Sequence, residues 1–509
     1  MAQSAGRPLA TRLLIALAIL LLWQRLIAFE SQFIPKTHTL GSSEGIYRLS
    51  AVPFLYFYWN FGVFPVAAPG VPDIVPAGLP ATEVLAAAGP RLRNDLNTPA
   101  AWGRMGDYAR LFLYLPSLWL GAEPAEASSI PAHSVLFVLA LLSVVVAFWR
   151  QHRLVQGVVF AVLVGSSSFQ LFETYEHDNL FSLPITIALF TLAFNLRYFA
   201  VATKPGFKRF DIGVAAFTAL MLATAREIRS EPVAIGAFLV LVYLGNWNFK
   251  LKQRLLMLAV LVTVFLGTAL AWAAYFDSKY RDAMRFVQDH GGKPAAPLFV
   301  HHHPIWHAIY CGLGDFGGER GYKWSDHVAY EAALPELRKR FYPDLQFAKI
   351  PFYFERASQP NEAYLIKPEG IPEYSQILRE RLLEDFRRNP GWYARLAAKR
   401  VRRMLFESPP LQLNLVLTTV EAPLRLWILI PLLLWAAATR RFFELKLMIF
   451  LLPLGATALL IFSDLGTINY QIAHLAGAAL FLGSHWVNKE KPSLGNAALV
   501  SSATGRSEG

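Results

Sequence analysis

Long apolar runs recur along this 509-residue sequence and restrict the folds that it can adopt. The first run, from Leu13 to Phe29, follows Arg7 and Arg12 and lacks a small-residue cleavage pattern, so we interpret it as a retained signal anchor. Nine further runs of roughly 16 to 21 residues are each long enough to cross about 30 Å of hydrocarbon. They lie near residues 133–149, 154–172, 180–200, 211–225, 232–247, 255–275, 424–439, 446–463 and 467–487. The sequence therefore predicts an all-α polytopic membrane protein with about ten transmembrane helices.

The composition agrees with a lipid environment. Hydrophobic residues make up 54% of the chain and charged residues 17%, which is more apolar surface than a soluble domain can bury. The net charge of +12 comes from short basic clusters between the apolar runs, which favours membrane orientation over nucleic-acid binding. The single cysteine, Cys311, excludes an intramolecular disulfide.

The charges between the runs predict the orientation, because short cytoplasmic loops are rich in Lys and Arg. With a cytoplasmic N-terminus, every second loop is basic. These basic loops carry Arg150 and Arg153; Arg197, Lys204, Lys208 and Arg209; Lys250, Lys252 and Arg254; Arg440, Arg441 and Lys446; and Lys489 and Lys491. We therefore expect a multi-pass protein of the cell inner (plasma) membrane with both termini in the cytoplasm.

This topology divides the chain into six regions. They are the cytoplasmic N-terminus with the signal anchor (1–29), a first extracytoplasmic loop (30–132), predicted helices two to seven (133–275), an extracytoplasmic subdomain (276–423), predicted helices eight to ten (424–487) and a disordered cytoplasmic tail (488–509). The two large segments lie on the same side of the membrane. Chemistry is therefore expected in these two segments.

Local patterns add detail to both large segments. Pro53, Pro65 and Pro69 make residues 51–70 a poor spanning helix, so we expect an interfacial segment there. The stretch 373–406 has apolar residues at helical spacing among many arginines, which predicts an amphipathic surface helix broken at Pro390. Gly312, Gly314, Gly317 and Gly318 permit tight turns around the aromatic residues of WHAIYCGLGDF and KWSDHVAY, so we expect these two stretches to belong to one folded outer subdomain.

Two short loops on the predicted extracytoplasmic side contain acids and arginines. Glu176, His177 and Asp178 lie between predicted helices three and four, either as the acidic wall of an active site or as a solvated loop with Asp178 as a helix N-cap. In TAREIRSEP, Arg226 and Arg229 are three residues apart and can share a helical face. That cluster is either a neutral ion-pair network or a site for a lipid-linked phosphate, whose oxygens suit the planar guanidinium.

The larger segments contain further candidates. Glu44 and Asp107 each lie beside a glycine and shortly before Tyr and Arg, next to an apolar stretch, so either suits a general base. Trp306, His307, Asp315 and Trp324 lie in a Gly-rich stretch of the kind that lines sugar pockets. The neighbouring His301, His302 and His303 are not accompanied by an HExxH or paired-cysteine pattern. We therefore expect no bound metal and no cofactor.

The chain resembles the GT-C superfamily of membrane glycosyltransferases, which includes protein O-mannosyltransferases and the aminoarabinose transferases of lipid A. Three stretches in the same order carry the resemblance: YARLFLYLPSLWLG, EHDNLFSLPITIALF and NPGWYARLAAKRVRRML. The resemblance implies a polyprenyl-phosphate sugar as donor and a first-loop acid as the base in an inverting transfer. That base would be Glu44, Asp95 or Asp107, with Asp178 assisting. The usual acidic motif soon after the first helix is absent here or reduced to Glu44.

Three function classes remain open at this point. A glycosyltransferase on the extracytoplasmic face would take a polyprenyl-phosphate sugar lipid, a glycan, lipid or protein acceptor, and surrounding membrane lipids as partners, with no nucleic acid. The alternatives are a polytopic transporter or flippase and a non-catalytic assembly protein of envelope polysaccharide synthesis. The charges cluster at predicted helix ends, which favours the glycosyltransferase over transport.

Overall fold

The structure is a computed structural model, and helices make up most of the residues that it describes. These residues are 6–28, 52–68, 80–94, 111–122, 129–167, 182–199, 207–228, 233–246, 248–292, 294, 305–341, 372–407, 410–415, 418–422, 425–451 and 459. Strands in these ranges are limited to an antiparallel pair, β1 (Leu411–Leu415) and β2 (Thr418–Ala422). The predicted all-α class is therefore confirmed for the described part of the chain.

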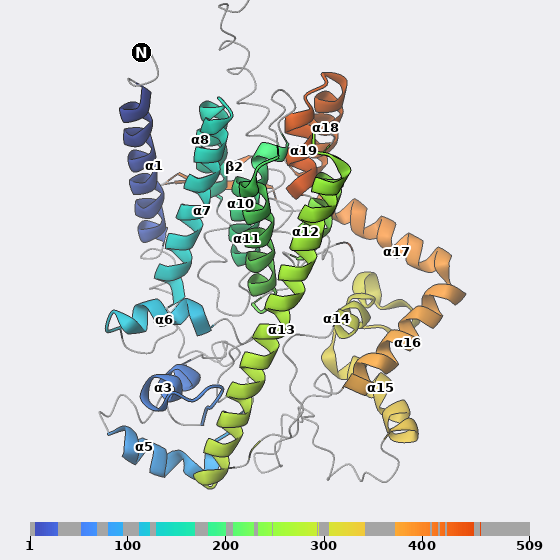
Figure 1. Cartoon of the computed structure of the whole chain (residues 1–509). Coiled ribbons are helices and arrows are strands. Elements are labelled where there is room, and N and C mark those ends of the chain that lie inside the picture. Colours follow the sequence, from blue (N-terminus) through green and yellow to red (C-terminus); the bar gives the residue numbers. More distant parts are fainter. Residues whose placement is uncertain are drawn as a thin grey trace, which may run out of the picture.

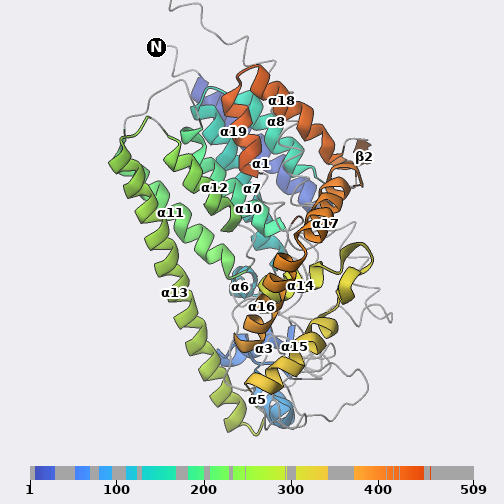
Figure 2. The ribbon, with the colours of Figure 1, turned by 90° about the vertical axis from the view of Figure 1, so that its right-hand side faces the viewer.

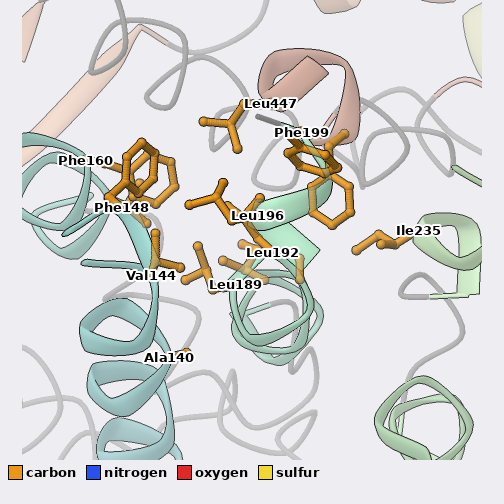
Figure 3. Packing of buried hydrophobic residues seen from close by; sticks show 14 of the residues in the cluster. Ala140, Val144, Phe148, Phe160, Leu189, Leu192, Leu196, Phe199, Ile235 and Leu447 are labelled. Atoms are coloured by element: carbon orange, nitrogen blue, oxygen red, sulfur yellow. The ribbon is translucent and has the colours of Figure 1, made fainter. Parts of the chain in front are cut away.

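A bundle of helices forms the upper half of the molecule in Figure 1. Its members are α1 (Gly6–Ala28), α7 (Ile130–Arg150), α8 (Leu154–Gly165), α10 (Ser182–Asn195), α11 (Arg209–Arg226), α12 (Val233–Leu244), α13 (Leu251–Asp289), α18 (Leu429–Ala438) and α19 (Phe442–Leu451). They share one apolar core, in which Phe148 of α7, Leu192 of α10 and Leu447 of α19 are fully covered (Figure 3). Segments from both ends of the sequence therefore pack into a single bundle.

The bundle helices coincide with nine of the ten predicted apolar runs, and the run 467–487 lies outside the described residues. Their lengths differ from the prediction. Among the described residues, only α7 and α13 are long and apolar enough to cross a membrane, judged by length and composition. Helices α8 and α12 have 12 residues each and are therefore about 18 Å long.

The turns between bundle helices gather basic residues at one end, which we call the basic end. Arg153, in the turn between α7 and α8, forms a 2.6 Å ion pair with buried Glu444 in the first turn of α19. Asp211 in the first turn of α11 is buried, pairs with Arg197 at 2.9 Å and accepts a 2.7 Å hydrogen bond from the Lys208 backbone N–H. A buried carboxylate requires a nearby cation or donor, and both carboxylates have one. The Arg153–Glu444 pair also links two different turns that are predicted to be cytoplasmic.

Helix α13 continues well beyond the bundle. Its 39 residues correspond to about 58 Å, roughly twice the thickness of a bilayer core. The apolar run ends at Tyr275, but the helix continues to Asp289 (Figures 1 and 2). This extension provides the surface on which residues of the first large segment fold.

Four short elements of the first large segment pack along α13, and we call them the N-terminal subdomain. They are α3 (Val52–Phe61), α5 (Ala81–Ala88), the 3₁₀ turn Gly89–Arg91 and α6 (Leu111–Trp119). Tyr56, Val84 and Leu92 share a core with Ala283 and Val287 of α13. Helix α3 has ten residues, about 15 Å, and is followed by Gly62 with φ 68°. It is too short to span a membrane, in agreement with the prediction from its prolines.

The second large segment folds into the C-terminal subdomain at the lower right of Figure 1. It consists of α14 (Ile305–Gly312), two 3₁₀ turns (Asp315–Gly317 and Glu319–Gly321), α15 (Asp326–Arg340), α16 (Pro372–Arg388), α17 (Pro390–Arg402) and a π turn (Arg403–Glu407). WHAIYCGLGDF contributes Cys311 and Leu313 to its core and KWSDHVAY contributes Tyr330, so the prediction of a shared subdomain is confirmed. The break at Pro390 is also confirmed.

The environment of α16 differs from the expected surface helix. Its apolar residues Tyr374, Leu378 and Leu382 are fully buried in the same core as residues of α14 and α15. An amphipathic pattern shows that a helix covers something apolar, and neighbouring helices satisfy it as well as lipid does. The apolar face of α16 therefore covers protein.

Gly314 gives a direct test of the close packing in this subdomain. A Cβ atom at Gly314 would lie 2.3 Å from the backbone Cα and C atoms of Lys323, which cannot move without displacing the chain. We expect Gly314→Ala to lower the free energy of unfolding by about 1–3 kcal/mol, as overpacking does elsewhere. Gly213→Ala in α11 is the control, because a Cβ there meets nothing within 4 Å. Denaturant unfolding of the detergent-purified variants measures both, and equal stability of the two would contradict the predicted clash.

Candidate functional site

Three segments that carry predicted site residues meet in one apolar cluster, which we call the junction cluster. It contains Leu111 of α6, Leu183 of α10 and Ile228 just after α11, packed with Phe54 of α3 and Phe276 of α13. In sequence, Leu111 follows Asp107 by four residues, Leu183 follows Asp178 by five, and Ile228 follows Arg226 by two. The fold therefore brings the chain segments next to these three candidates together, although they are far apart in sequence.

Most of the predicted acids cannot be placed individually. The predicted acids Glu44, Asp95, Asp107, Glu176 and Asp178 lie outside the described residues, as do His177 and Arg229. Arg226 is described, and it is the last residue of α11. The position of the candidate site is thus defined by Arg226 and the junction cluster.

The Arg226 side chain is partly buried, and its guanidinium forms no ion pair or hydrogen bond within the described ranges. Two residues before it, Thr224 accepts a 3.1 Å hydrogen bond from the Trp272 indole N–H, which ties the end of α11 to α13. After Arg226 the backbone leaves the helix, since Glu227 and Ile228 form a turn. Helix α11 ends at Arg226, and Arg229 lies outside the described residues, so a helical face shared by the two arginines stays a prediction. A cation in the last turn of a helix interacts favourably with the helix dipole and stabilises the helix. This would be a purely structural role for Arg226.

The four predicted sugar-pocket residues lie in the C-terminal subdomain and are not part of the junction cluster. Trp306 is partly buried against the subdomain core, and the Trp324 residue is 44% exposed. His307 and Asp315 are both only 4% exposed and contact protein side chains. His307 and Asp315 are therefore buried among protein side chains, whereas the two tryptophans are less completely covered.

Asp315 belongs to a buried ion cluster. Its carboxylate lies 2.9 Å from the Arg403 guanidinium and 3.5 Å from Arg400 Nε. Arg400 is completely buried and donates hydrogen bonds to the carbonyl oxygens of Gly312 and Leu459. Burial lowers the pKa of Arg400, and the adjacent Asp315 carboxylate opposes that shift. This cluster joins α14, α17 and the following turns, so its role is structural.

His307 has neighbours that the sequence did not predict. Its Nδ1 lies 2.6 Å from the Tyr374 hydroxyl, and its Nε2 lies 3.1 Å from an Asp326 carboxylate oxygen and 3.7 Å from Cys311 Sγ. The available sequence signal was the spacing of four between His307 and Cys311, which places both on one face of a helix. Asp326 and Tyr374 lie on other helices and come close only in the fold.

A cavity of about 690 Å³ lies at the basic end of the bundle. Its lining residues are Leu139, Leu142, Ser143, Val146, Ala147, Arg150, Gln151, Ala193, Phe194, Leu196, Arg197, Lys208 and Phe210. Lys208 precedes the first residue of α11 and Arg226 is its last, so about 25 Å of helix separates the cavity from Arg226. The cavity is therefore distinct from the candidate site.

Comparisons with known proteins do not add to these observations. No family model matches the chain, and neither a curated protein nor a solved structure was found to be similar to it. Function is therefore inferred from the residues of this chain.

Proposed function

We propose that this chain is a polytopic membrane glycosyltransferase of the GT-C type, which moves a sugar from a polyprenyl-phosphate donor to an acceptor on the extracytoplasmic face. The observation that supports this proposal best is the junction cluster, where segments flanking Asp107, Asp178 and Arg226 meet. Transfer needs a base for the acceptor and cations for the departing phosphate. Acids and an arginine near one end of a helix bundle supply both.

Exposed apolar side chains on the bundle support its location in a membrane. Leu270 of α13 is 71% exposed, and Leu241 of α12 and Leu434 of α18 are 65% exposed each. Similar residues are exposed on α1, α7 and α11. A soluble monomer rarely presents so many large apolar residues around one bundle, whereas lipid tails would cover them.

The proposed chemistry balances without a cofactor. A hydroxyl oxygen of the acceptor attacks the anomeric carbon, the bond from that carbon to the phosphate oxygen breaks, and the polyprenyl phosphate leaves with the electron pair. A first-loop acid (Glu44, Asp95 or Asp107) takes the acceptor proton while Asp178 assists in orienting the reacting groups. Arg226, aided by Arg229, neutralises the charge that grows on the leaving phosphate.

The ionisable groups of the bundle favour this proposal over transport. Asp211 and Glu444 are buried, but each lies in the first turn of its helix and is paired with an arginine at the basic end. A transporter generally places such groups near the middle of the membrane. Within the described helices, these two buried carboxylates instead lie at helix starts and pair with arginines of the connecting turns.

Reconstituted protein tests the proposed reaction. Vesicles containing the purified chain, a polyprenyl-phosphate sugar with a radiolabelled sugar, and cell-envelope material as acceptor should release polyprenyl phosphate and transfer the label. Vesicles without protein are the control. Movement of the intact donor across the bilayer, with no transfer of label, would favour a flippase instead.

The topology is tested separately with reporter fusions. We expect fusions at Lys204 and Gly318 to report opposite sides of the membrane, because basic residues flank Lys204 in a predicted cytoplasmic loop and Gly318 lies in the extracytoplasmic subdomain. Enzymatic reporters that are active on one side only measure this directly. The same sidedness at both positions would refute the ten-helix topology.

A further inference from the structure

His307, Cys311 and Asp326 bring three different metal-ligand types to one place in the C-terminal subdomain. Their ligand atoms (His nitrogen, Cys sulfur and a carboxylate oxygen) all lie within 4.8 Å of one another. His307 and Cys311 are buried on one face of α14, and Asp326 is the first residue of α15. A single ion could therefore contact both helices.

Two of the three distances between the ligand atoms are close to those in a tetrahedral zinc site. Zinc bonds of about 2.3 Å to sulfur and about 2.0–2.1 Å to nitrogen or oxygen require about 3.6 Å between sulfur and nitrogen and about 3.3 Å between nitrogen and oxygen. The corresponding distances are 3.7 Å from Cys311 Sγ to His307 Nε2 and 3.1 Å from that nitrogen to Asp326 Oδ1. Each of these two distances is within a few tenths of an ångström of the value that zinc requires, and the third, between Cys311 Sγ and the Asp326 carboxylate, is within 4.8 Å and would shorten by a rotation of the exposed Asp326 side chain.

The contacts of the His307 ring already direct Nε2 toward the other two ligand atoms. Nδ1 lies 2.6 Å from the hydroxyl of Tyr374 on α16, and the imidazole stacks on Tyr330 at a centroid distance of 5.5 Å. A ligating histidine usually donates its second N–H to a fixed acceptor, which sets the tautomer and directs Nε2 at the metal. Tyr374 is fully buried and can serve as that acceptor.

We propose that His307, Cys311 and Asp326 form a zinc site in which a water molecule supplies the fourth ligand. Thiolate and imidazole favour zinc over magnesium or calcium, which prefer oxygen ligands. The Asp326 side chain is 61% exposed, so the ion and the water can enter from solvent. This proposal is independent of the glycosyltransferase proposal and reverses the expectation from the sequence that no metal is bound.

Hydrogen bonding alone is the competing explanation. Cys311 Sγ lies 3.7 Å from the Ser325 carbonyl oxygen, and Asp326 can pair with a protonated His307. In that case the cluster would hold α14 against α15 without an ion. The two explanations differ in metal content and in the response to a chelator.

Metal analysis of the detergent-purified full-length chain decides between them. We expect one zinc per chain, and we expect loss of that zinc in Cys311→Ser and in Asp326→Asn. Asp326→Asn is the safer variant for folding, because its side chain is exposed. Tyr374→Phe removes only the hydroxyl and should weaken zinc binding by about 10- to 100-fold. The matched control replaces His301, His302 and His303 with alanine and should retain the zinc.

Two further measurements complete the test. Cobalt substituted for zinc should show a thiolate-to-cobalt charge-transfer absorption that disappears in Cys311→Ser. A chelator should lower the melting temperature of the wild type, and added zinc should restore it, because metal binding contributes to folding. A chain that binds no zinc on titration, or zinc that persists in both ligand variants, would overturn the proposal.

Discussion

Asp178→Asn is expected to abolish measurable sugar transfer while the protein still folds. The amide has the size of the carboxylate but cannot take a proton or hold the acceptor through a charged oxygen. Misplacing the reacting groups reduces turnover by about 10²-fold, so loss of the orienting carboxylate should bring transfer down to the background. Transfer from a polyprenyl-phosphate sugar in reconstituted vesicles measures the effect, and an unchanged melting temperature shows that folding is intact.

Arg226→Lys is the counterpart of this prediction on the phosphate side. Lysine keeps the positive charge but loses the planar pair of donors, so turnover should fall by about tenfold or more. Arg209→Lys is a matched control, because Arg209 is the first residue of the same helix and is exposed at the basic end. Wild-type activity in both Asp178→Asn and Arg226→Lys would remove these residues from the mechanism. Their loops would then be ordinary paired loop charges.

Arg400→Met is expected to have the largest effect on stability. Arg400 is completely buried, pairs with Asp315 and donates to two carbonyl oxygens. Methionine fills part of the space but donates no hydrogen bond to the Gly312 and Leu459 carbonyl groups. It also removes one of the two cations that lie beside the Asp315 carboxylate. Removing one member of a buried ion pair costs about 3–5 kcal/mol. Thermal denaturation and limited proteolysis of the detergent-purified protein measure the loss.

Lys399→Ala is the control for Arg400→Met, because it removes the neighbouring cation from the surface of the same helix. Lys399 pairs with Glu319 at 3.3 Å, and both side chains are about half exposed. Such pairs contribute about 0–1 kcal/mol. Similar destabilisation by the two substitutions would show that the buried cluster does not hold the subdomain together.

The helices were largely predictable because their causes are local. Apolar run lengths located nine bundle helices, and the missing N–H and fixed ring of Pro390 ended α16 where expected. The end of α13 was not predictable from hydropathy. Asp277 and Lys279 end the apolar run, but backbone hydrogen bonds do not require apolar side chains, so the helix continues through both.

The candidate sites depended on contacts that no local pattern contains. Asp315 among aromatic residues and glycines suggested a sugar pocket, yet Arg400 and Arg403, more than 80 residues later, bury and pair its carboxylate. His307 likewise gains Asp326 and Tyr374 from other helices.

By itself the sequence determined which segments are helical and where prolines and basic loops interrupt them, because helix formation and apolar length depend on neighbouring residues. Only the tertiary structure decided which charges are buried and which ligand atoms meet. The free-energy cost of burying a charge depends on its ion-pair and hydrogen-bond partners. Many of these partners are distant in sequence, and only folding brings them into contact with the charge.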